Sequence, residues 1–246
     1  MIYIYDGTFN GLLTLIFDGY KDLENSKIVT EKTQIDFLQD FRKITTDRKK
    51  ANRVKTGIIG HFSEKFFRDM TVVFRSDYEF KGEVIAKTIK GMYKEGYTYL
   101  MSPNESSVMF NKLVKYVYGE NHSFKGLARF REVEDGFLYA KIRPKCDILD
   151  LLTPHFVKRL PNEKFIIHDV GRDIFSIYEN GYVDYFENEE IIVKDTKEEE
   201  FFKKAWIKFY DSVAIDERNN KKLMINNMPK YLWEFLPERN KLKKWL

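Results

Sequence analysis

The chain has one cysteine, Cys146, among its 246 residues. It therefore cannot form an internal disulfide bond, and its own thiolates cannot build a zinc or iron–sulfur site. Long apolar runs are missing too, because no run approaches the ~20 residues that a membrane-spanning helix needs. The start "MIYIYDGTFNGLL" lacks the basic region of a signal peptide. These absences predict a soluble, cytoplasmic protein that does not bind a membrane.

Catalytic signatures are equally scarce. The sequence contains no glycine-rich phosphate loop, no G-x-S-x-G nucleophile turn and no histidine pair with a carboxylate at metal-ligand spacing. It has only four histidines. We interpret His61, which falls within a helical pattern, as structural, and His122, in a polar segment, has no partner that the sequence identifies. We therefore predict neither a metal nor a cofactor.

The net charge of +4 is small, but its distribution is uneven. Between Arg42 and Lys55, seven basic residues stand against one acidic residue, Asp47, a net of +6. Between Asp184 and Glu200, eight acidic residues stand against two lysines, a net of −6. The two runs are suited to pair with each other, or the basic run to face a nucleic-acid backbone. Taken alone, each run is more often an ordinary solvated surface.

Apolar periodicity indicates where the elements lie. "MIYIYD" predicts a strand, and Thr8 predicts the N-cap of a helix whose apolar residues recur every three or four positions. Helical patterns follow over residues 47–69, 78–95 and 103–118, and the glycines of "GENHSFKG" predict a turn after the last of them.

The pattern then changes to period two. "FKGLARFREVEDGFLYAKIRP" predicts a hairpin with its turn at "EDG", and "KFIIHDVGRDIFSIYENGYVDYF" predicts further antiparallel strands. A dense apolar face predicts a helix over residues 197–213. We expect a single α+β domain over residues 1–246, with an antiparallel or mixed sheet of about six strands packed against several helices. It is helix-rich over 40–120, strand-rich over 124–187 and helical again over 197–246.

"LLTPHFVKR" raises the first site hypothesis. If Thr153 caps a helix and Pro154 occupies its first turn, His155 lies near free backbone N–H groups that can hold an anion. Arg159, one turn further along the same face, is suited to grip a phosphate. The alternative is that His155 packs against the sheet and Arg159 pairs with a carboxylate such as Asp150.

"FIIHDVGRD" supplies the second group, with His168, Asp169 and Arg172 at a strand end and turn. Arg129 and Arg131 lie on one face of the preceding hairpin, because strand residues alternate between faces. If the two motifs lie side by side, the donors form one phosphate-binding surface. Its members are His155, His168, Arg129, Arg131, Arg159 and Arg172.

Several blocks of the sequence resemble, in order and nearly end to end, a bacterial family usually called probable DNA metabolism protein. The blocks are "IYDGTFNGLL", "FKGLARFRE", "LYAKIRP", "LLTPHFVKR", "FIIHDVGRD", "SVAIDERNN" and "MPKYLWEFLPE". Members are typically encoded beside a radical-SAM protein thought to modify or repair DNA, and longer relatives carry a uracil-DNA-glycosylase-like domain. The resemblance implies a process and a radical-SAM partner. Because this chain lacks the three-cysteine motif of a radical-SAM enzyme, that chemistry belongs to the partner.

Three functions follow as expectations. The leading one is a DNA-binding accessory protein of DNA modification or repair that uses Arg129, Arg131, Arg159 and Arg172. The second is a nucleic-acid-processing enzyme with His155, His168 and Asp169 as catalytic residues, Asp6 being another candidate acid. The third is a protein–protein scaffold that uses the acidic run 184–200 and the aromatic tail, without DNA binding.

Overall fold

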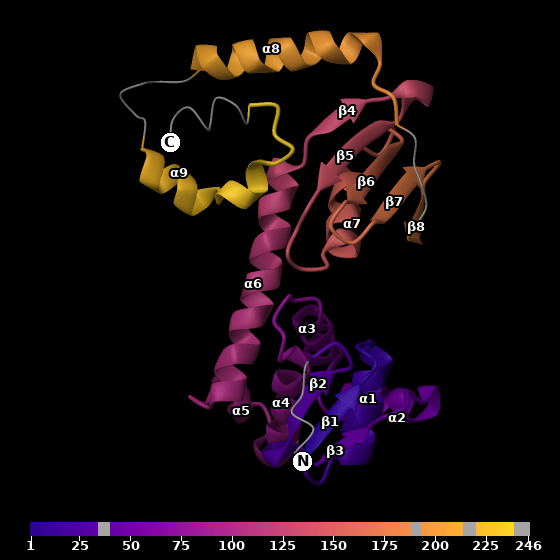
Figure 1. Ribbon diagram of the computed structural model, residues 1–246, viewed down its shortest axis with the longest axis vertical. Helices are drawn as coiled ribbons and strands as arrows, with labels where there is room; N and C mark the ends of the chain where they lie inside the picture. The colour runs from indigo at the N-terminus through magenta and orange to yellow at the C-terminus, as the bar shows by residue number, and fades with distance from the viewer. Residues whose placement is uncertain (34–39, 188–192, 214–219, 239–246) are drawn as a thin grey trace. The chain divides into compact units, whose positions relative to one another are not determined.

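The computed structural model describes residues 1–33, 40–187, 193–213 and 220–238. The chain forms two compact units, Met1–Tyr118 and Gly119–Leu246, and each is described by itself (Figure 1). The α+β class predicted from the sequence is confirmed. That residues 1–246 make a single domain stays a prediction.

A three-stranded sheet lies at the centre of the N-terminal unit. Its strands are β1 (Ile2–Tyr5), β2 (Lys27–Thr30) and β3 (Phe41–Lys43), in the order β2-β1-β3. Both pairings are parallel, with Tyr3 opposite Ile28 and Arg42. All four residues of β1 are buried, as expected for the central strand of a covered parallel sheet. The sequence predicted β1, but it did not predict a separate parallel sheet.

Helices pack against this sheet, and a side-chain N-cap begins three of them. Thr8 caps α1 (Phe9–Gly19) by accepting a hydrogen bond from the backbone N–H of Gly11 at 2.9 Å. The helix predicted over 47–69 is two helices, because Ser63 caps a second one. The remaining helices that begin in this unit are α2 (Arg48–His61), α3 (Glu64–Phe74), α4 (Lys81–Glu95), α5 (Thr98–Met101) and α6 (Glu105–Leu127).

Helix α6 contradicts the turn predicted over "GENHSFKG". It continues through Gly119 and Gly126 as far as Leu127. Val117 and Phe124, seven residues apart, are both buried, so the apolar face persists on both sides of Gly119. A helical glycine costs only about 1 kcal/mol relative to alanine, and buried apolar neighbours outweigh that cost.

The C-terminal unit contains a five-stranded mixed sheet (Figure 1). Its strands, in order, are β4 (Phe130–Glu132), β5 (Leu138–Ile142), β6 (Phe165–Asp169), β7 (Ile174–Glu179) and β8 (Tyr182–Glu187). The β4–β5, β6–β7 and β7–β8 pairs are antiparallel, as predicted, whereas β5 and β6 are parallel. The helix α7 (Leu149–Arg159) lies in the connection between the two parallel strands.

The two faces of this sheet carry different residues, because strand neighbours point to opposite faces. One face packs against α7, where the hydroxyl oxygens of Thr153 and Ser176 lie 2.8 Å apart and the rings of Phe156 and Phe130 are 4.9 Å apart. We call this the helix face. The register gives the opposite face, which we call the histidine face, a different set: Arg131, Tyr139, Lys141, Ile166, His168, Phe175 and Ile177.

The chain ends in α8 (Lys197–Val213), α9 (Lys221–Asn227) and a 3₁₀ turn over Lys230–Trp233. The helix predicted over 197–213 is confirmed. The basic end 239–246, residues 188–192 of the acidic run and "AIDERN" within the block "SVAIDERNN" lie outside the described residues. Within the described parts of the chain, every helix is too short or too polar to cross a bilayer.

Candidate functional site

A basic groove follows the end of β3 in the N-terminal unit. It has a volume of about 620 Å³. Its lining consists of Asp18, residues 42–48 and Lys50. Residues 42–48 and Lys50 belong to the sequence run with net charge +6. The first part of that run therefore lines a groove.

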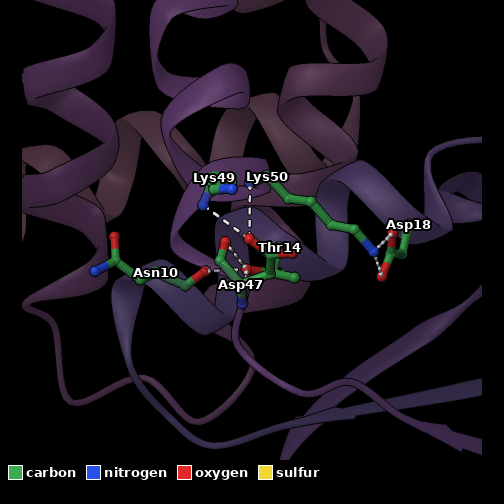
Figure 2. Close-up of polar contacts among 6 residues, drawn as sticks. All are labelled: Asn10, Thr14, Asp18, Asp47, Lys49 and Lys50. Carbon is green, nitrogen blue, oxygen red and sulfur yellow. Dashed lines mark hydrogen bonds and ion pairs between the residues drawn. The ribbon is translucent and has the colours of Figure 1, made fainter.

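Hydrogen bonds join α1 to the N-cap of α2, next to the loop that lines this groove (Figure 2). The hydroxyl of Thr14 donates to the backbone carbonyl of Asp47 at 3.1 Å, and the Asp47 N–H lies 3.1 Å from the same hydroxyl oxygen. The Asp47 carboxylate in turn accepts from the backbone N–H groups of Lys49 and Lys50 at 2.8 and 3.2 Å. The cap therefore fixes where α2 begins and directs its first cationic residues.

Asp6 supports the other side of the same loop. Its carboxylate accepts hydrogen bonds from the Thr8 hydroxyl at 2.8 Å and the Thr46 hydroxyl at 2.6 Å. Burial by itself would raise the pKa of Asp6, but these bonds outweigh burial and lower it. A Cβ at Gly11 would overlap the Asp6 carboxylate, so glycine is required there. Asp6 thus acts as a structural anchor for the residues that line the groove.

The cations of the basic groove differ in their partners. Lys50 forms an ion pair with Asp18 at 2.7 Å, and the exposed Lys43 pairs with Glu31 at 2.9 Å. Arg42, Arg48 and Lys49 are exposed, and within the described residues no carboxylate lies at ion-pair distance from any of them. Among the described residues, no acid at ion-pair distance would compete with an external anion for these three cations.

His168 lies at the centre of a hydrogen-bonded chain on the histidine face of the C-terminal unit. Its Nδ1 is 2.7 Å from the Tyr139 hydroxyl, and its Nε2 is 3.3 Å from Oδ1 of Asp173. Burial raises the pKa of Tyr139, with Asp173 adding to the rise and Arg131 opposing it. A histidine between a hydroxyl and a carboxylate is an arrangement that can relay a proton.

Asp169, the predicted acid partner of His168, lies on the helix face. Its side chain is fully buried and accepts from the Gly171 N–H at 3.0 Å and from Nη1 of Arg172 at 2.8 Å. Burial raises the pKa of Asp169 even though Arg172 opposes the rise. Arg172 also donates to the backbone carbonyls of Pro144 and Lys145. Asp169 and Arg172 therefore stabilise the turn that follows β6. The acid beside His168 is Asp173 instead.

The hairpin arginines are also held by acids. Arg129 lies 3.4 Å from Glu238 and over the ring of Trp206, and Arg131 lies 2.6 Å from Asp195. Burial would raise the pKa of Asp195, but Lys203 and Arg131 outweigh that effect and lower it. The sequence predicted the positions of these arginines but not their partners.

The helix α7 places His155 and Arg159 away from His168. Thr153 does not cap the helix as predicted, because the helix begins four residues earlier and the Thr153 hydroxyl donates to the Leu149 carbonyl at 2.7 Å. His155 is therefore distant from the free N–H groups of a helix start. It is half-buried, Arg159 is exposed, and burial lowers the pKa of His155, with Lys125 and Arg159 contributing. His155 Nε2 is buried, and the described residues offer it no hydrogen-bond partner.

The structure thus does not bring the six predicted donors together. His168 and Arg131 are on the histidine face, while His155 and Arg159 are on α7, which covers the helix face. Sequence reasoning missed Tyr139 and Asp173. Strand alternation could have indicated Tyr139, which is paired with Arg131 across the hairpin. For Asp173 the only signal was its position in the turn after His168.

No cluster of three or more histidine, cysteine or acidic residues suited to a metal occurs within the described residues. A family model described as a domain of unknown function, DUF4130, matches residues 79–238. The matched residues include Tyr139, His168 and Asp173, which form the hydrogen-bonded chain described above. The residues that line the basic groove precede the match. Neither the curated proteins nor the solved structures include a significant match to the chain.

Proposed function

We propose that this chain, which belongs to the DUF4130 family, is a DNA-binding accessory protein of DNA modification or repair. The observation that carries the proposal is the basic groove, which the exposed Arg42 and Arg48 line, with the exposed Lys49 next to Arg48 in the sequence. Cations of this kind bind a nucleic-acid backbone by displacing its condensed counterions. The process itself comes from the resemblance of the sequence to probable DNA metabolism proteins.

The proposed DNA-binding surface lies in the N-terminal unit, whereas the residues expected from the sequence lie in the C-terminal unit. Three of those arginines form ion pairs: Arg129 with Glu238, Arg131 with Asp195 and Arg172 with Asp169. A phosphate would have to compete with these carboxylates. Arg159 is exposed but isolated from the others. Lys43 and Lys50 pair with acids, but Arg42, Arg48 and Lys49 face no such competition at ion-pair distance within the described residues.

A radical-SAM protein is the proposed partner in this process. The chain has a single cysteine, which is buried, and so it cannot ligate an iron–sulfur cluster through a three-cysteine motif. In this proposal the partner catalyses the reaction and this chain binds the DNA. Co-purification of the two proteins, with and without DNA, tests the pairing.

The direct test is fluorescence anisotropy with short labelled single- and double-stranded DNA at several salt concentrations. The Arg42→Ala/Arg48→Ala/Lys49→Ala variant should bind on the order of 100-fold more weakly near 0.15 M salt, and its log–log salt slope should fall by about 0.9 per lost duplex contact. A matched control removes three exposed cations of the same unit outside the groove: Arg68→Ala/Lys112→Ala/Lys115→Ala.

The control has the same change in net charge, so it separates local contacts from overall attraction. If the wild type binds no DNA, or if both triple variants lose affinity equally, the basic groove is not the binding site and the proposal fails.

A second candidate function is nucleic-acid processing by an enzyme, and the Tyr139–His168–Asp173 chain is the observation that favours it. In this proposal His168 is the catalytic base or acid, in place of the predicted group of His155, His168 and Asp169. Incubation with end-labelled DNA, with and without divalent metal, should show turnover that His168→Gln abolishes and His155→Gln retains. Turnover that survives His168→Gln would exclude this role.

A further inference from the structure

A second concave surface lies on the histidine face of the C-terminal unit. It is a cavity of about 300 Å³, which we call the sheet cavity. A volume of this size is at the lower end of the range for small-molecule sites. Its lining comes from the sheet, α8 and the residues after the 3₁₀ turn: Arg129, Arg131, Tyr139, Lys141, Lys203, Ile207 and residues 234–237.

One wall of the sheet cavity is cationic. Arg131 and Lys203 share the carboxylate of Asp195, at 2.6 and 2.7 Å, which holds both side chains in place. Lys141 is exposed, and no described carboxylate forms an ion pair with it. Glu234 also lines the cavity and pairs with Arg143 at 2.8 Å. Among the described lining residues, Lys141 is therefore the cation suited to a charge-assisted contact with a phosphate.

Other residues of the lining form a group that we call the apolar wall. Ile207, Phe235 and Pro237 are half-buried and Leu236 is buried, so their exposed parts form a small hydrophobic surface. A purely ionic ligand such as free phosphate would leave this wall unused. The two walls together fit a ligand with an anionic end and a flat apolar ring.

Tyr139 also lines the cavity, and its contacts hold it in place before any ligand binds. Its ring lies 5.1 Å from the Arg131 guanidinium and 5.9 Å from Lys141 Nζ, and its hydroxyl is 2.7 Å from His168. The ring is 3% exposed and therefore loses little freedom on binding. Such preorganisation lowers the entropic cost of association.

We infer that the sheet cavity binds a nucleoside monophosphate, with its phosphate at Lys141 and its base against the apolar wall. The site lies in the C-terminal unit and inside the DUF4130 match. It is independent of the proposed DNA-binding groove. Nucleotide binding by the Arg42→Ala/Arg48→Ala/Lys49→Ala variant at wild-type affinity would be the expected sign of this independence.

Isothermal titration calorimetry of the full chain with deoxyadenosine and thymidine 5′-monophosphates tests the inference. We expect a Kd below about 1 mM for the wild type, and weaker binding of inorganic phosphate and of the free nucleosides, because each half-ligand contacts one wall. Lys141→Gln should weaken nucleotide binding about 10-fold by removing a charge-assisted contact, and Lys141→Arg should restore most of it.

The matched control is Lys158→Gln, which removes an exposed lysine of α7, the helix that covers the other face of the sheet. It should bind as the wild type does. Ile207→Glu, with its fold verified by circular dichroism, should abolish binding by placing a carboxylate in the apolar wall. No binding by the wild type, phosphate bound as tightly as nucleotide, or equal losses in Lys141→Gln and Lys158→Gln would each overturn the inference.

Discussion

The arginines of the two units have the same chemistry but different neighbours. In the N-terminal unit, Arg42 and Arg48 are exposed and unpaired within the described residues. In the C-terminal unit, Arg129 and Arg131 each contact an acid. The count of cations in the sequence does not distinguish these cases. What decides is whether an acid from a distant part of the chain reaches the guanidinium, and this separates cations that stabilise the fold from cations that can bind a ligand.

The largest expected effect concerns the buried pair of the C-terminal unit. Asp169→Ala should lower the free energy of unfolding by about 3 kcal/mol, because it leaves the Gly171 N–H and the Arg172 guanidinium without their acceptor. Urea denaturation followed by circular dichroism measures the change. Arg159→Ala, which removes an exposed arginine of the same unit, is the control and should cost less than about 0.5 kcal/mol. Equal losses would remove the distinction between paired and free arginines.

Arg131→Ala should give an intermediate effect. The arginine is about three-quarters buried, and its partner Asp195 keeps Lys203 at 2.7 Å, so we expect a loss of about 1 kcal/mol in the free energy of unfolding. DNA affinity, measured by anisotropy, should remain within about 2-fold of the wild type. A large loss of DNA affinity with unchanged stability would return the DNA-binding surface to the C-terminal unit, as the sequence first indicated.

Local patterns predicted the hairpins and the starts of α1, α2 and α8. "EDG" and "ENG" form turns in which Asp135, Gly136, Asn180 and Gly181 adopt positive φ, the conformation that such residues accept most readily. Pairings between distant segments were not predictable in the same way. The parallel partners of β1 begin 25 and 39 residues further along the chain than β1 itself, and no turn residue specifies such a pairing.

In the candidate site, too, features set by neighbouring residues were predictable from the sequence, and contacts between distant residues were not. Adjacent strand residues point to opposite faces, so the separation of His168 from Asp169 was contained in the sequence. The partners of Arg129 and Arg131 were not, because Glu238 is 109 residues from Arg129 and approaches through the fold. The predicted place of His155 at a helix start was wrong for a local reason, since α7 begins upstream of Thr153.

A smaller, pH-dependent effect is expected from His155. Burial, Lys125 and Arg159 lower the pKa of this histidine in the folded state below its unfolded value near 6.5. Its contribution to stability is therefore complete above pH ~6.5 and is lost as the pH falls through the folded-state pKa. Thermal melts between pH ~7 and ~5 should show a shallower decline for His155→Gln than for the wild type. Parallel declines would mean that His155 is not desolvated in the C-terminal unit.

The smallest effect on stability should come from Arg48→Ala in the basic groove. Arg48 is exposed and touches no described carboxylate, so the free energy of unfolding should change by less than about 0.5 kcal/mol. The same variant should bind DNA roughly 5-fold more weakly near 0.15 M salt. Arg131→Ala should show the reverse profile, with stability lost and DNA affinity kept. Chemical denaturation and anisotropy on these two variants thus separate a cation that holds the fold from one that is free for a ligand, and matching profiles would contradict the assignment of DNA binding to the basic groove.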